Sequence, residues 1–294
     1  MRSKPEEIWS PESNMEEGRR WEDLAMDCLV NVFSRLNLED LTLGVPFVCK
    51  SWHKASLDPQ CWKILNFRAL DLMPWGSFSK RFAQAYHIKS FSFSSFMKLA
   101  TARSRRSAID LSLPSTAFIA SLPDLIYASN ECPRVKLLAL PDVLQTYAKR
   151  IPEIIGRWKE LEFLDMGLKP PSFEPILEQI SLHCKSFVGL QMYGCLYRED
   201  ALAIVTHLPK LKYLAMKGSY LSKQELLVIL DGCRELEELD VTRCRGFDVD
   251  DEVLRKASGI KAFEYKGSKF HDDYDEYEDV LWGLVLEVHR FHQS

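Results

Sequence analysis

The chain has 294 residues, is 46% hydrophobic and carries a net charge of −4. This composition suits a packed core over the full length, and the weakly negative charge does not point to nucleic acid as a partner. No apolar run approaches the roughly 18 residues of a membrane-spanning helix. Residues 1–19 are polar, without an apolar core for export or membrane insertion, and are expected to form a flexible N-terminal segment.

Residues 20–67 have the pattern of several short helices. A first helix is expected with Asp27 as N-cap and Asn37 at its end, followed by a short element over 38–43 and a further helix over 46–56. Asp58 before Pro59 predicts one more helical turn. The first apolar stripe at helical spacing is Leu29, Val32, Phe33 and Leu36. A core this small must pack against the rest of the chain or against a partner to be stable.

This segment resembles an F-box, the helical domain that docks substrate receptors onto a Skp-type adaptor in cullin ubiquitin ligases. The resemblance rests on Val48-Cys49-Lys50-Ser51-Trp52, followed in the expected order by Trp62-X-X-Leu65-X-Phe67. The sequence departs from the F-box pattern at Ala25, where most members have Pro. It also departs over residues 42–47, because this stretch between the second and third helices looks about one residue longer than usual. The resemblance implies that some matching positions fill the adaptor groove and others the F-box core: Leu24, Ala25, Leu29, Val32, Phe33, Leu36, Leu41, Val48, Cys49 and Trp52.

From residue 62 onward, a frame of apolar-X-X-apolar-X-apolar recurs with a spacing of 20 to 27 residues. Such a period predicts leucine-rich repeats, each a short strand with a helix or loop, stacked into a curved solenoid over residues 68–270. The expected fold class is therefore α/β: a small helical domain followed by parallel short strands with helices on the convex side. The frame begins at Trp62, Ile88, Ala108, Val135, Leu161, Phe187, Leu211, Leu236 and Ile260.

Helix signals lie between these strands. Ser172 precedes a helical stripe, Ser222 and Glu225 form a capping box, and Asp250 precedes another stripe. Cysteines follow the repeat: Cys132, Cys184 and Cys233 each lie three residues before a frame, while Cys195 and Cys244 lie eight residues after one. This resembles the cysteine-containing repeat of F-box proteins. Burial as small apolar side chains explains the pattern better than zinc, because no C-x₂-C pair occurs.

Alternation along each strand predicts the concave face of the solenoid. An aromatic and charged row there makes this face a candidate substrate surface, although Phe163 and Tyr213 could instead stack on each other. The residues expected on this face as the substrate site are Phe163, Asp165, Gln191, Tyr193, Tyr213, Lys217, Glu238 and Asp240. Residues 271–294 combine an acidic run at 272–279 with a helical stripe that is expected to cap the open end of the solenoid.

The sequence lacks the common nucleotide-binding, nucleophile-elbow and zinc-protease motifs, and no cofactor is expected. The combination resembles plant F-box/leucine-rich-repeat proteins. It implies a non-catalytic substrate receptor of a Skp–cullin–F-box ubiquitin ligase, which contacts the adaptor directly, the cullin indirectly and an unknown protein substrate through the repeats. The alternative is a repeat scaffold that acts outside a ligase. Eight cysteines without a secretory signal suggest a reducing compartment, the cytoplasm or nucleus.

Overall fold

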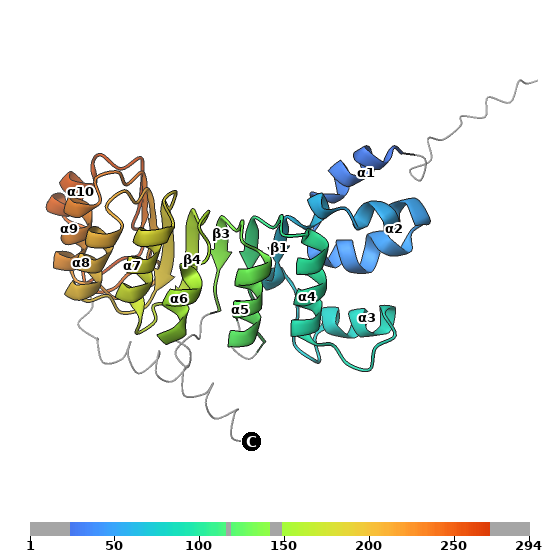
Figure 1. Cartoon of the computed structure of the whole chain (residues 1–294). Coiled ribbons are helices and arrows are strands. Elements are labelled where there is room, and N and C mark those ends of the chain that lie inside the picture. Colours follow the sequence, from blue (N-terminus) through green and yellow to red (C-terminus); the bar gives the residue numbers. More distant parts are fainter. Residues whose placement is uncertain (1–23, 116–118, 142–148, 271–294) are drawn as a thin grey trace, which may run out of the picture.

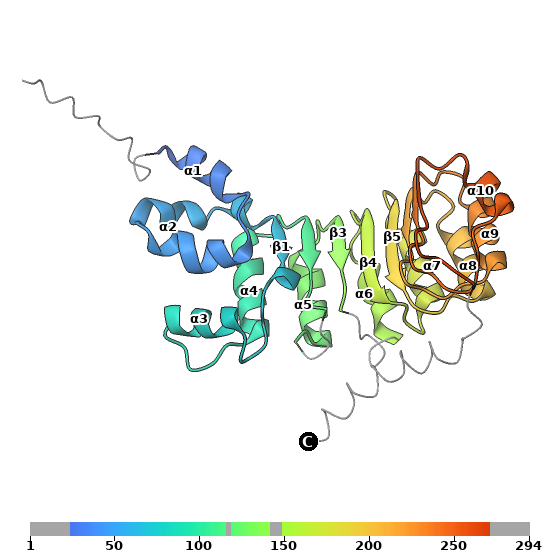
Figure 2. The ribbon, with the colours of Figure 1, turned by 180° about the vertical axis from the view of Figure 1, so that it is seen from behind.

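The computed structural model describes residues 24–115, 119–141 and 149–270. A helical N-terminal unit adjoins a parallel sheet whose strands follow one another in chain order, with helices stacked along one face (Figures 1 and 2). The sequence-based fold class, a small helical domain followed by a leucine-rich-repeat solenoid, is confirmed. The acidic run and the expected C-terminal helix lie outside the described residues.

The N-terminal unit consists of α1 (Met26–Phe33), a π-helical turn η2 (Asp40–Gly44), a 3-10 turn η3 (Val45–Phe47), α2 (Lys50–Ser56) and the 3-10 turn η4 (Pro59–Trp62). The predicted ends of the first helix are wrong. Ala25 is the N-cap, whereas Asp27 lies inside the first turn and accepts from the Cys28 N–H at 3.0 Å. Asn37 does not close α1: its side chain accepts from the Asp40 N–H at 2.8 Å and so caps the next helical segment.

The stretch over 42–47, expected to be about one residue longer than usual, begins within the π-helical turn η2. A π-helical turn contains one more residue per hydrogen-bonded ring than an α-helical turn. The Thr42 hydroxyl, fully buried, donates to the Leu38 carbonyl at 2.6 Å and holds this turn. The capping role predicted for Asp58 is confirmed, because its carboxylate accepts from the Gln60 N–H at the start of η4.

Eight strands form the sheet, all parallel and each paired with the next. In most of them the central residue is buried and its neighbours are more exposed, which is the alternation expected of a pleated strand with one covered face. The strands are β1 (Ile64–Asn66), β2 (Asp110–Ser112), β3 (Leu137–Ala139), β4 (Phe163–Leu168), β5 (Gly189–Tyr193), β6 (Tyr213–Ala215), β7 (Glu238–Asp240) and β8 (Ala262–Glu264).

The frame that begins at Ile88 does not form a strand. The chain between β1 and β2 instead forms η5 (Phe67–Ala69), α3 (Ser77–Ala85) and α4 (Phe93–Ser104). Phe91 and Phe93 mimic the repeat frame in sequence, but their rings pack into an aromatic cluster with Phe78, Phe82 and Phe96 or with Phe67. A helix and a loop can bury these apolar side chains as well as a strand can.

The other repeats carry their helices on one face of the sheet, as predicted (Figure 1). Ser222 and Glu225 form the predicted capping box, and Asp250 accepts from two N–H groups of the last helix. Ser172 stands at the N-cap as expected but makes no side-chain capping bond. The helices are α5 (Leu122–Glu131), α6 (Ile151–Ile155), α7 (Phe173–His183), α8 (Arg198–His207), α9 (Lys223–Gly232) and α10 (Asp251–Ala257).

The repeat cysteines are buried and connect neighbouring repeats. The Cys184 thiol donates to the Trp158 carbonyl at 3.2 Å, and the Cys244 thiol donates to the Met216 carbonyl at 3.0 Å. Burial raises the pKa of Cys244 to about 12, so the thiol stays protonated at neutral pH. Among the described residues, no group of His, Cys, Asp or Glu side chains is arranged to hold a metal ion, and no helix is long and apolar enough to cross a membrane.

Candidate functional site

The helical unit separates its apolar positions into a core and a surface. Leu29, Phe33 and Leu41 are buried, and the Phe33 ring meets the half-buried Trp52 edge-on with centroids 5.1 Å apart. Leu36 and Cys49 are also half-buried, whereas Leu24, Ala25, Val32 and Val48 are exposed. The ten positions that the sequence grouped together thus divide between packing and surface, and helical spacing alone did not distinguish the two.

The exposed apolar side chains lie on α1 and on the turn before α2. Val32 is 47% exposed, Phe47 56% and Val48 59%, and Leu24 and Met26 add to them at the start of α1. Side chains of this size so open to solvent, in a unit this small, are typical of a protein-binding surface. Met26 and Phe47 were not predicted, because their exposure depends on how α1 and η3 pack and not on their spacing.

Cys49 occupies the N-cap position of α2 within this surface. Its thiol lies 3.1 Å from the Ser51 hydroxyl. The hydrogen bond with Ser51, followed by one from the Trp52 backbone, lowers the pKa of Cys49 below its ordinary value. This thiol therefore differs from the buried repeat thiols, whose pKa is raised by burial.

Side chains bind the helical unit to the first repeats. The Trp62 indole is fully buried and donates to the Ser56 carbonyl at 2.7 Å, while the Arg103 guanidinium of α4 lies 4.8 Å from the centre of its ring. The Tyr86 hydroxyl, at the end of α3, donates to the Thr42 carbonyl in η2 at 2.9 Å. The two parts of the chain are therefore joined by packing and hydrogen bonds in addition to the peptide backbone.

The face of the sheet away from the helices is the concave face, and two rows of side chains cross it. Strand pairing places one residue of every strand in each row. The first row is Ile64, Asp110, Leu137, Phe163, Gly189, Tyr213, Glu238 and Ala262. The second row is Asn66, Ser112, Ala139, Asp165, Gln191, Ala215, Asp240 and Glu264.

The predicted substrate residues lie in these rows or just beyond them. Asp165, Gln191, Tyr193 and Lys217 line a pocket of about 220 Å³, together with Arg68, Ser115, Gly167 and Met192. Phe163, Tyr213, Glu238 and Asp240 belong to the rows. Their role in substrate binding stays a prediction.

Phe163 and Tyr213 do not lie on neighbouring strands, because Gly189 of β5 stands between them in the row. A Cβ atom placed on Gly189 would approach the Phe163 ring to 2.1 Å, so the ring lies over this glycine.

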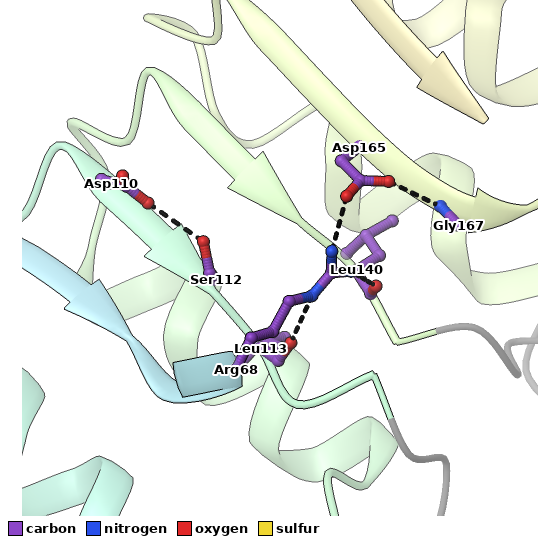
Figure 3. A network of polar contacts seen from close by, with 7 residues as sticks. All are labelled: Arg68, Asp110, Ser112, Leu113, Leu140, Asp165 and Gly167. Carbon is purple, nitrogen blue, oxygen red and sulfur yellow. Dashed lines mark hydrogen bonds and ion pairs between the residues drawn. The ribbon is translucent and has the colours of Figure 1, made fainter. Parts of the chain in front are cut away.

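Arg68 provides a connection that the sequence analysis missed (Figure 3). From η5, directly after β1, its guanidinium extends to three acceptors: the Leu113 carbonyl at 3.0 Å, the Leu140 carbonyl and the Asp165 carboxylate at 2.5 Å. Asp165 in turn accepts from the Gly167 N–H. Nothing in the local sequence marks this contact, because Arg68 and Asp165 are 97 positions apart.

Comparison with known proteins agrees with this geometry. The F-box domain family matches residues 21–64. An F-box/LRR-repeat protein of Arabidopsis thaliana is 29% identical over 76% of this chain and 72% of its own length. The Arabidopsis F-box protein FBW2 is 27% identical over 90% of this chain and 80% of its own length. The Arabidopsis F-box protein SKIP1 is 28% identical over 78% of this chain and 80% of its own length.

An F-box implies binding to a Skp-type adaptor, and F-box proteins are in general substrate receptors of ubiquitin ligases and not catalysts. The chain therefore combines an F-box with leucine-rich repeats, and over most of its length it is homologous to the F-box/LRR-repeat proteins of Arabidopsis.

Proposed function

We propose that this chain is the substrate-recognition subunit of a Skp–cullin–F-box ubiquitin ligase. The F-box binds the adaptor through its exposed apolar surface, the repeats bind a protein target, and the cullin is held indirectly through the adaptor. The target is then ubiquitinated, and degradation is the expected outcome. The observation that carries the proposal is one chain with an exposed apolar surface on its F-box and, as far as the described residues extend, an uncovered concave face on its repeats. The expected location is the cytoplasm, the nucleus or both.

The proposed mechanism is proximity. A receptor of this kind makes and breaks no bonds; it raises the effective concentration of a target lysine near a ubiquitin-loaded enzyme that other subunits carry. Such an effect needs a defined geometry between the two binding surfaces. The contact of the Arg103 guanidinium with the buried Trp62 ring and the hydrogen bond from Tyr86 to Thr42 support it, because they restrict motion of the F-box relative to α3 and α4.

The test of adaptor binding uses the exposed side chains, because buried ones would unfold the domain. The double variant Val32→Glu, Val48→Glu is expected to lose adaptor binding by at least tenfold, since each change places a charge in an apolar interface. The matched control is Leu182→Glu, Leu202→Glu, which alters side chains that are 53% and 45% exposed on α7 and α8. Co-purification of adaptor and cullin with each variant is the measurement.

Three results are informative. Loss of both partners from the F-box variant only, with unchanged thermal unfolding, supports the proposal. Adaptor binding without cullin in the wild-type chain would favour a scaffold outside a ligase. Full adaptor binding by the F-box variant would contradict the proposed interface. Target binding is tested separately, by capture after proteasome inhibition with the intact chain and with a variant that lacks the F-box.

A further inference from the structure

The first row of the concave face has an unusual order of acidic and apolar side chains. Acidic side chains stand at two places in it, Asp110 on β2 and Glu238 on β7. Between them the row holds Leu137, Phe163, Gly189 and Tyr213. Leu137 is 44% exposed, although it is an aliphatic residue, and Phe163 and Tyr213 are half-buried. The row is therefore an apolar strip with a carboxylate at each end.

On the concave face, acidic side chains outnumber the basic side chains that pair with them. Neither row contains Lys or Arg. Two of its carboxylates are neutralised by nearby cations: Asp165 by Arg68 and Asp240 by Lys217 at 2.9 Å. Within the described part of the chain, Asp110, Glu238 and Glu264 have no ion-pair partner. The apolar strip of the first row is thus bordered by negative charge that no residue in the described ranges compensates.

The position of Asp110 suits the binding of a cation. Strand register places it between Ile64 and Leu137, both exposed, and its carboxylate accepts a hydrogen bond from the Ser112 hydroxyl at 3.2 Å. Arg68 is not available to it, because the guanidinium is bonded to Asp165 and two carbonyls (Figure 3). A bound Lys or Arg could lay its aliphatic stem on the neighbouring apolar side chains and direct its charge to the carboxylate.

The environment of Asp110 agrees with this geometry. Burial raises the pKa of its carboxyl, against the opposing effect of the Ser112 hydroxyl. Part of the desolvation that a bound cation would require is therefore already present in the free protein.

We propose that the first row binds an extended segment of the target in which an apolar stretch is flanked by two basic residues, one on Asp110 and one on Glu238. The inference rests on the proposed receptor function and names its substrate class. Five strand spacings of about 4.8 Å separate the two acids, so they lie roughly 24 Å apart along the row. An extended chain covers that distance in about seven residues. The segment thus crosses the strands and does not add a strand to the sheet.

The probes are labelled peptides of about nine residues, added to the full-length chain and followed by fluorescence anisotropy. The first has Arg near both ends, about seven positions apart, with Leu, Ser and Phe between. The second is identical but has Glu in place of both Arg. The third keeps both Arg but places them adjacent. The first peptide is expected to bind on the order of tenfold more tightly than either of the others.

Variants of the two acids test the assignment. Asp110→Asn and Glu238→Gln are each expected to weaken the Arg peptide several-fold, and Asp110→Lys with Glu238→Lys to reverse the preference toward the Glu peptide. The control is Glu178→Lys, a single charge reversal at an exposed position of α7 on the helix side. Asp110→Asn should not lower the midpoint of thermal unfolding, because it removes a carboxylate that burial disfavours.

Equal binding of the Arg and Glu peptides, no binding of either, or an unchanged preference in the doubly reversed variant would overturn the proposal. The same variants are assayed for adaptor binding and for F-box-dependent turnover of captured targets. Turnover that persists without any peptide preference refutes the substrate class and leaves the receptor function standing. Loss of adaptor binding in the wild-type chain would instead refute the receptor function, while the peptide measurement remains valid on its own.

Discussion

At the scale of single residues, the cysteines differ in chemistry because they differ in surroundings. Burial raises the pKa of Cys132 and Cys233 to about 12 and that of Cys184 to about 11. Cys49 lies at a helix start beside a hydroxyl, and its pKa is lowered. The thiolate, and not the thiol, reacts with electrophiles. The buried cysteines are therefore protected both by low accessibility and by a raised pKa, whereas Cys49 is more accessible and has a lowered pKa.

We therefore expect iodoacetamide at pH 8 to alkylate the exposed Cys28 and the half-buried Cys49 in the folded protein, whereas Cys132, Cys184, Cys233 and Cys244 react only after unfolding. A raised pKa keeps these thiols neutral until the pH passes that value. Peptide mass mapping over time is the measurement, and labelling in guanidinium chloride, where all cysteines should react, is the control. Rapid alkylation of Cys244 in the native state would show that its repeat opens readily.

Adaptor binding should slow alkylation of both Cys49 and Cys28, because Cys49 follows the exposed Val48 and Cys28 lies one helical turn before the exposed Val32 on α1. Protection of neither cysteine would place the adaptor elsewhere on the F-box.

At the scale of elements, η2 and α3 form a joint between the F-box and the repeats. The Thr42 carbonyl in the π-helical turn accepts from the Tyr86 hydroxyl. The Tyr86 ring also stacks on Phe82 with centroids 4.4 Å apart and meets Phe47 edge-on. The inserted helix α3, which interrupts the repeat pattern between β1 and β2, thus supports the turn that precedes the exposed apolar surface.

Tyr86→Phe tests this joint. It removes one hydroxyl and leaves the Thr42 carbonyl without that partner, with an expected loss of about 1 kcal/mol in the free energy of unfolding. Tyr127→Phe is the matched control, because no hydrogen bond joins the Tyr127 hydroxyl to any residue in the described ranges. Urea denaturation followed by tryptophan fluorescence measures both variants. Identical midpoints would show that the bond contributes no net stability.

At the scale of the whole molecule, stability should spread along the stack and not reside in one core. Each repeat of a solenoid contacts mainly its neighbours, so contacts that skip a repeat are uncommon. Arg68 makes such a contact, from the end of β1 to Asp165 on β4, and it bonds the chain after β2 and β3 on the way. The F-box end of the sheet is therefore coupled directly to its middle.

Arg68→Lys is expected to lower the free energy of unfolding by about 2 kcal/mol, because an ammonium group cannot serve three acceptors in the geometry of a guanidinium. Hydrogen exchange should quicken in β1 to β3 more than in β6 to β8. Lys223→Ala, which removes surface ion pairs with Asp250 and Glu252, serves as the control and should change stability little. Uniform acceleration over all strands would mean that the repeats unfold as one unit and that Arg68 has no special coupling role.

The sequence by itself determined the repeat architecture. Buried central residues such as Leu164, Leu190 and Leu214 must recur at similar intervals if similar units stack, so the strands from β1 to β8 could be located in advance. The frame at Ile88 misled because an apolar pattern specifies burial and not the element that achieves it. The F-box was identified from the order of its apolar and aromatic residues, an order that follows from its own small core.

Only the tertiary structure decided which of those residues face solvent. Leu29 and Val32 share one helical stripe, yet one is buried and the other is 47% exposed, because α2 and η4 cover only part of α1. The contact of Arg68 with Asp165, and the lack of an ion-pair partner for Asp110 among the described residues, were equally beyond the sequence. Local spacing determines which side chains share a face; the partner that each charge meets depends on strand order and on reach across the sheet, which arise only when the repeats are stacked.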